Sequence, residues 1–114
     1  MAERLAKWRP PAACRGAPHR IFCVAILIDQ PMWPAHGRLW AHLVSDSDLG
    51  ELHAFAQAHG IPHRSFDLDH YDVPEEAHAR LVAGGAEHVD GRELTRRLIA
   101  SGLRVPARDR RRNR

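Results

Sequence analysis

Long hydrophobic runs are missing from this chain of 114 residues. No apolar stretch approaches the roughly 18 residues that a membrane-spanning helix needs, so we expect no span and no membrane partner. The first 20 residues also lack an apolar secretory segment of about seven residues, which favours a cytoplasmic protein with reduced thiols. The two cysteines, Cys14 and Cys23, are too few for a disulfide framework or a four-cysteine zinc site.

Familiar catalytic motifs are absent as well. The sequence contains no Gly-x-Gly-x-x-Gly or Walker pattern, so a conventional nucleotide-phosphate loop is unsupported. It also contains no His-Glu-x-x-His or Cys-x-x-Cys spacing that would identify a metal site directly. What it has in excess is histidine, with nine His against three Phe and one Tyr. Any site must therefore be sought in how the fold gathers these imidazoles.

The net charge of +3 conceals an uneven distribution. Residues 1–20 carry five basic side chains against Glu3, and residues 104–114 carry six Arg against Asp109, whereas 21–103 hold six Arg against twelve acidic residues. We therefore expect a basic disordered arm over 1–20, a single acidic α/β domain over 21–104 and a basic tail over 105–114. Translation starting near Val24 is an alternative account of the arm. The basic ends could bind nucleic acid through phosphates, or simply keep the chain soluble.

Apolar periodicity within the domain predicts alternating strands and helices. Strands are expected over 21–28, 39–44, 63–68 and 86–89, with a Pro- and Gly-containing loop before the second. Helices are expected over 47–59 with Ser47 or Asp48 as the cap, from a capping box at 72–75 to about Ala83, and from a capping box at 90–93 to Gly102. This order favours a small, mainly parallel sheet of about four strands with three helices.

Each expected strand is followed by acidic residues: Asp29, Asp46, the group Asp67, Asp69 and Asp72, and Asp90. Strand ends in a parallel sheet share one edge, so these carboxylates should converge there, where like charges need a cation or protons. We therefore predict a divalent metal site that uses Asp29, Asp46, Asp69 and His70. Mg²⁺ or Mn²⁺ is favoured if oxygen ligands dominate, and Zn²⁺ or Fe²⁺ if histidine does.

Histidines near that edge supply catalytic candidates. The segment Asp69-His70-Tyr71-Asp72 packs two carboxylates and an imidazole into four residues. We predict catalytic roles for His70, Asp72 and His42, and a substrate loop that contains Trp33 and His36.

Structural roles are the alternative for several of these residues. Asp46, Asp72 and Asp90 could cap helices, His42 could be a satisfied core histidine, and Trp33 and Trp40 could serve packing alone.

A family resemblance covers about residues 24–105. The segments ILIDQPMWPAHG, HLVSD, ELHAFA, GIPHR, FDLDHYDV and GRELTRRLIASGLR resemble the uncharacterised bacterial and phage domain-of-unknown-function family 4031, with HYDV and the Asp-x-Pro-x-Trp-Pro loop as the most specific pieces. The basic head is not part of that pattern. The resemblance implies no known activity and carries over no catalytic residue.

Together these features predict a small metal-dependent hydrolase for a phosphoester or nucleotide-type substrate. The alternative is a non-enzymatic module whose acidic edge binds a small ligand or a protein. A domain of about 80 residues leaves little room for a deep pocket, so a homodimer could supply one wall.

Overall fold

The computed structural model describes residues 25–112. Several expectations lie outside the described residues: the basic arm over 1–20, the alternative start near Val24, the two cysteines and the first part of the strand expected over 21–28. Within the described residues, no helix is long and apolar enough to cross a membrane.

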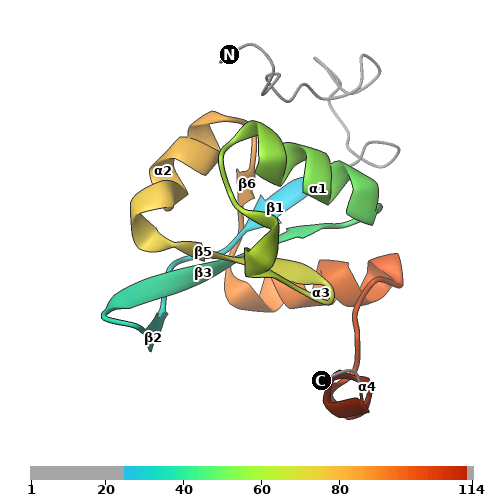
Figure 1. The fold of residues 1–114 in the computed structure, drawn as a ribbon. Coiled ribbons are helices and arrows are strands. Elements are labelled where there is room, and N and C mark those ends of the chain that lie inside the picture. Colours follow the sequence, from blue (N-terminus) through green and yellow to red (C-terminus); the bar gives the residue numbers. More distant parts are fainter. Residues whose placement is uncertain (1–24, 113–114) are drawn as a thin grey trace.

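Strands and helices alternate only in part along the chain (Figure 1). The elements are β1 (Ile26–Ile28), β2 (Trp33–Ala35), β3 (Arg38–Ser45), α1 (Leu49–Ala58), the 3₁₀ turn η3 (His63–Ser65), β4 (Phe66–Asp67), β5 (His70–Pro74), α2 (Glu75–Ala83), β6 (Glu87–His88), α3 (Gly91–Ser101) and α4 (Ala107–Arg112).

The sheet has six strands and is mostly antiparallel, so the expected mainly parallel sheet of about four strands is wrong. Its order is β4-β5-β3-β1-β6, and β2 pairs with β3 beside β1. Among the strand pairs within residues 25–112, only β1–β6 is parallel. The α/β class itself is confirmed.

Tight hairpins account for the antiparallel pairing. The segment expected to be a loop before β3 folds back as β2, and His36 and Gly37 connect the two strands with φ of 52° and 78°. Positive φ at both central residues is the signature of a type I′ turn, which matches the twist of antiparallel strands. A second hairpin joins β4 to β5, so Asp69 to Asp72 lie in a turn and a strand rather than in a loop.

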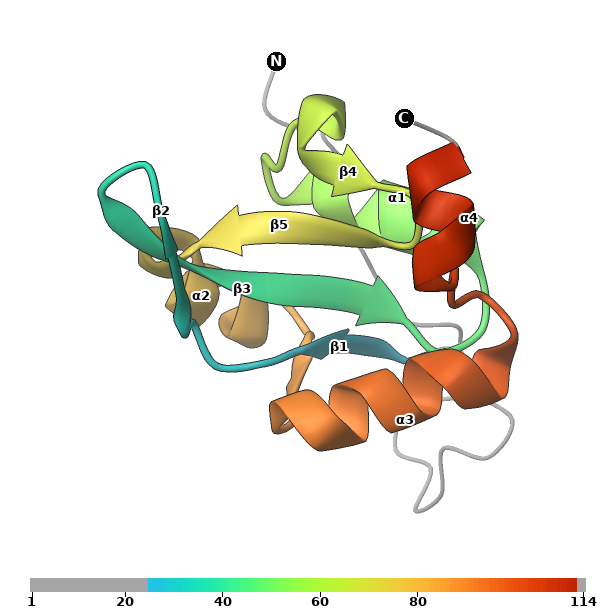
Figure 2. The same cartoon turned by 90° about the horizontal axis from the view of Figure 1, so that it is seen from below.

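Helices cover the two faces of the sheet unequally. In Figure 1, α1 and α2 lie above the sheet and α3 lies below it; Figure 2 shows α3 running along β1, with β3 and β5 not covered by it in that view. The α1–α2 face carries the larger apolar cluster, which includes Leu43, Phe55 and Leu81. The opposite face carries a smaller one: Ala25, Leu27, Val44, Leu94 and Leu98. Part of this second face is therefore left for polar side chains.

Local capping signals are largely confirmed. Asp48 caps α1 by accepting from the backbone N–H of Glu51, and Asp90 caps α3 by accepting from that of Glu93. Gly102 ends α3 with φ of 83°. Asp72, however, does not cap α2, because β5 continues through Pro74 and the helix starts without a side-chain cap.

Candidate metal centre

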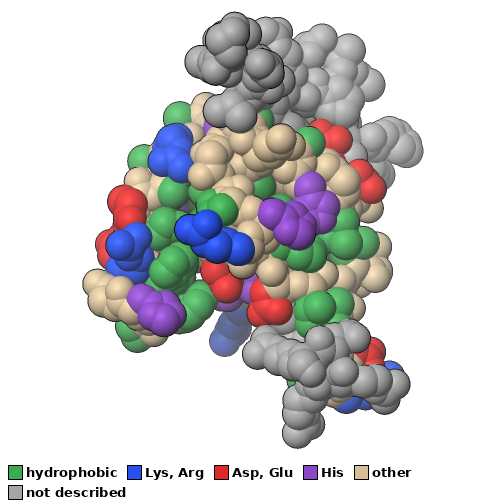
Figure 3. Space-filling view, in the orientation of Figure 1, with side chains coloured by type: hydrophobic (Ala, Val, Ile, Leu, Met, Phe, Trp, Pro, Cys, Tyr) green, Lys and Arg blue, Asp and Glu red, His purple; other side chains and the backbone are tan. Residues whose placement is uncertain are grey.

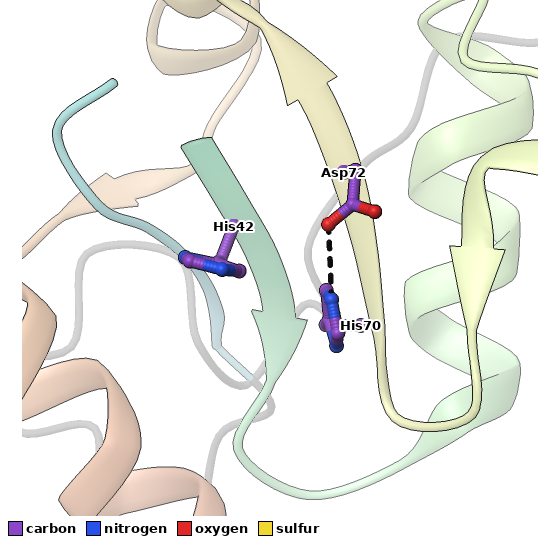
Figure 4. Close-up of side chains that lie close together, drawn as sticks. All are labelled: His42, His70 and Asp72. Carbon is purple, nitrogen blue, oxygen red and sulfur yellow. Dashed lines mark ion pairs between the residues drawn. The ribbon is translucent and has the colours of Figure 1, made fainter. Parts of the chain in front are cut away.

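Three side chains meet on the part of the α3 face that α3 leaves open. His42 on β3 lies opposite Asp72 on β5 in the strand register, and His70 lies two residues before Asp72 on the same face. One ligand atom from each of the three lies within 4.8 Å of the others. Figure 4 shows His42 on one strand and His70 with Asp72 on its neighbour. A pair of histidines and one carboxylate is a recurrent ligand set for divalent metals.

Asp29 orients His42 through two hydrogen bonds. It follows β1, is 7% exposed, and its Oδ1 accepts the backbone N–H of His42 at 2.6 Å. Its Oδ2 lies 2.8 Å from Nδ1 of the same histidine. An ionised carboxylate can only accept, so Nδ1 donates and the lone pair of neutral His42 is left on Nε2. Asp29 therefore positions His42 instead of facing the shared space itself.

Asp69 likewise orients His70. This carboxylate is fully buried, and its Oδ1 lies 2.7 Å from Nδ1 of His70. Its Oδ2 accepts the backbone N–H of Val105 at 2.8 Å and lies 3.9 Å from Arg104. The preceding turn is strained, because Leu68 has φ of 64°, a conformation that costs a non-glycine residue about 1–3 kcal/mol. Carboxylates that orient metal-bound imidazoles in this way are typical of metal sites.

The electrostatics of the centre favour a cation. Burial alone would lower the pKa of His70, but the carboxylates of Asp69 and Asp72 outweigh it and raise the pKa to about 9. The metal-free protein therefore carries an imidazolium here at neutral pH, where a metal ion would otherwise supply the positive charge.

Asp72 supplies a buried oxygen. Its Oδ1 forms an ion pair with Nε2 of His70 at 3.0 Å and has no other partner among the described residues. Two ligands of a tetrahedral zinc ion, each about 2.0–2.1 Å from the metal, stand roughly 3.3 Å apart. The 3.0 Å spacing is close to that value, so a small adjustment would let both atoms bind one ion.

Two hollows adjoin this centre. The larger, of about 400 Å³, includes Asp72 in its lining. The other residues around it are Trp33, Ala35, His36, Trp40, Arg64, Ser65, Phe66 and Asp67. The smaller, of about 140 Å³, is lined by His42 and His70 together with Arg104 and residues of α3. Both ligand histidines and the ligand carboxylate therefore face space that a small molecule could enter.

Asp46 is not part of this cluster. Because β1 and β3 run antiparallel, the end of β3 lies beside the start of β1, and Asp46 accepts the backbone N–H of Ala25 at 3.0 Å. Its other oxygen lies 2.7 Å from Arg97. The expectation that all acidic strand ends share one edge is therefore wrong, and Asp46 is not brought to the other candidates. Asp90 acts as a helix cap.

The expected substrate loop lies beside the centre. The ring of Trp33 stacks with that of His42, with centroids 6.0 Å apart and planes 27° from parallel. His36, at the tip of the hairpin, lines the larger hollow with Trp33. In Figure 3 a green apolar surface over the lower left, where Figure 1 places this hairpin, adjoins basic and acidic side chains.

Sequence reasoning missed the positioning roles of Asp29 and Asp69, and also Arg64 and Arg104 at the hollows. A period-two alternation was the available signal, because HYDVP read as a strand places His70 and Asp72 on one face. The same alternation in β3 places His42 on the face that carries Val44.

Comparisons with known proteins give one match. A family model described as protein of unknown function (DUF4031) matches residues 26–101. No curated protein and no solved structure matches the chain.

Proposed function

We propose that this chain, which belongs to the DUF4031 family of proteins of unknown function, is a metal-dependent hydrolase. Its metal ligands would be His42, His70 and Asp72, and its substrate a small phosphoester or nucleotide-type molecule. The single observation that carries the proposal is the convergence of two imidazoles, each paired through Nδ1 with a carboxylate, and one buried carboxylate oxygen.

The ligand set favours Zn²⁺ or Fe²⁺ over Mg²⁺. Two of the three ligands are imidazoles, whereas Mg²⁺ prefers oxygen ligands and retains several waters. Three protein ligands leave an open position at a tetrahedral ion, which is the arrangement of catalytic rather than structural zinc. A metal bound there would lower the pKa of a water molecule and polarise a phosphoryl oxygen.

The chain's own residues would handle the substrate. Asp29 and Asp69 hold the two imidazole rings in place, so the centre needs little reorganisation when a ligand arrives. Arg104 lines the smaller hollow beside both histidines and brings a guanidinium to the place where a phosphate would bind. The larger hollow reaches Asp72 and would hold the rest of the substrate.

A metal titration tests the first step. Zn²⁺, Fe²⁺, Mn²⁺ and Mg²⁺ are added separately to chelator-treated protein, and the melting temperature is followed. An ion that binds only the folded state raises the melting temperature with concentration. We expect Zn²⁺ or Fe²⁺ to act at lower concentration than Mg²⁺, and Asp72→Asn to remove most of the rise. The matched controls His88→Gln and Asp109→Asn lie outside the cluster and should keep the full rise.

An activity assay tests the second step. The metal-loaded protein is incubated with p-nitrophenyl phosphate and with bis(p-nitrophenyl) phosphate, and nitrophenolate release is measured with and without chelator. Chelator-sensitive release that is lost in His42→Gln supports hydrolysis. Metal binding without release from either ester would instead favour the non-enzymatic binding module. No response to any of the four ions would refute the metal centre itself.

A further inference from the structure

We infer that the larger hollow is a nucleobase subsite, so that the substrate of the proposed hydrolase is a nucleotide held by its base. The inference rests on the proposed function for the role of the metal, but the base-binding site stands on the residues of the hollow alone. Its walls come from the β2–β3 hairpin on one side and from η3 and β4 on the other.

Aromatic rings supply the hairpin wall. Trp33 and Trp40 face each other across the register of β2 and β3, with ring centroids 6.0 Å apart and planes 26° from parallel. A hydrogen bond of 2.8 Å from Nε1 of Trp40 to the carbonyl of Ala35 holds that indole in place. Trp33 also stacks with His42, and the guanidinium of Arg38 lies 5.9 Å from the Trp40 ring centroid, so the indoles offer the hollow only the aromatic surface that these neighbours leave. A flat base could pack against that surface.

The opposite wall carries polar groups that a base could use. Arg64 is exposed and lines the hollow, and a guanidinium can stack on a ring or donate to its acceptors. Ser65 comes from the same segment and offers a hydroxyl that can donate or accept. Nucleobase edges carry both donors and acceptors for such groups, whereas simple alkyl or aryl esters lack N–H donors.

Size and position agree with this ligand class. A volume of about 400 Å³ lies near the lower end of the roughly 300–1,000 Å³ of small-molecule pockets. Asp72 lies in the wall of this hollow and also in the metal-ligand cluster. A base held between Trp33 and Arg64 would therefore place its attached phosphate toward His42, His70 and Arg104, which line the smaller hollow.

Binding of defined probes to the full chain tests the inference without requiring catalysis. Adenosine, AMP, ribose 5-phosphate and maltose are titrated into chelator-treated protein by isothermal calorimetry. We expect adenosine and AMP to bind, and ribose 5-phosphate to bind at least about tenfold more weakly than AMP, since it lacks the base. Trp33→Leu should weaken adenosine binding by about tenfold or more, in the range measured for base–aromatic stacking.

Two further variants separate recognition from folding. Arg64→Ala removes an exposed side chain outside the metal cluster, so it should weaken adenosine binding severalfold and leave the zinc-dependent rise in melting temperature unchanged. Met32→Ala is the matched control, because Met32 precedes Trp33, is 72% exposed and does not line the hollow. It should bind adenosine like the parent protein.

The outcomes distinguish this inference from the proposed function. Absence of adenosine binding in a protein that still binds Zn²⁺ would overturn the nucleobase subsite and leave the metal centre standing. Equal affinity for AMP and ribose 5-phosphate, or preference for maltose, would also overturn it. Adenosine binding that Arg64→Ala and Trp33→Leu both weaken, in a protein that ignores every metal, would support the subsite and refute the hydrolase.

Discussion

The stability of the metal-free protein should depend on pH through His70. The folded protein raises the pKa of this imidazole from 6.5 to about 9, because the stabilisation by Asp69 and Asp72 exceeds the cost of burial. The stabilising contribution is therefore fully present below about pH 6.5 and is lost as the pH rises through about 9. A shift of this size corresponds to roughly 3 kcal/mol in the free energy of unfolding.

Urea denaturation in the presence of chelator measures the effect. Unfolding free energies are determined between pH 6 and pH 10 for the parent protein and for His70→Gln, and the difference isolates His70 from the other titrating groups. The advantage of the parent over the variant should shrink by about 2–3 kcal/mol across this range. Asp72→Asn removes only one of the two carboxylate partners of His70. The unfolding free energy of this variant should therefore fall less between pH 6 and pH 10 than that of the parent protein.

Two results would contradict this reasoning. A difference between parent and His70→Gln that stays constant across the range would mean that the pKa of His70 is not raised in the folded state. A difference that grows with pH would mean that burial, which lowers the pKa, exceeds the attraction of the carboxylates.

Three other predictions follow from the same geometry. Zinc binding at pH 7 should release about one proton from His70. In calorimetry the apparent binding enthalpy should then change with the ionisation enthalpy of the buffer, and a binding enthalpy that is the same in every buffer would argue against release of that proton. Asp29→Asn should lower zinc affinity about 10–100-fold through loss of His42 orientation, measured by competition with a chelating dye, and unchanged affinity would deny Asp29 a positioning role. Asp90→Ala should destabilise the protein by about 1 kcal/mol in urea, because the backbone N–H of Glu93 loses its acceptor; no loss would show that this cap contributes nothing.

Much of the local structure could be predicted from the sequence. The caps Asp48 and Asp90 and the end of α3 at Gly102 all follow from signals within a few residues of one another. The capping-box spacing of Asp72 and Glu75 led to a wrong prediction for the start of α2, because β5 extends through Asp72. Pairing with β3 stabilises that strand, and such a long-range contact leaves no trace in the local pattern.

Most residues of the candidate site could be predicted from the sequence, but the way in which the fold brings them together could not. Five of the expected residues, Asp29, His42, Asp69, His70 and Asp72, do lie together, although for a different reason than a shared edge of parallel strands. Asp29 reaches the site because it follows β1 at the level of His42 on the antiparallel neighbour. Asp46 is excluded by that same pairing.

The amino-acid order by itself determined α1, α3 and most of α2, the caps Asp48 and Asp90, and the abundance of imidazole and carboxylate groups, because these depend on near neighbours in the chain. Only the tertiary structure decided that β1, β3 and β5 lie antiparallel. That pairing in turn decides which carboxylate forms a hydrogen bond with which histidine. Strand direction is set by turn geometry and by how the apolar faces are buried against α1, α2 and α3, and both depend on contacts between distant parts of the chain.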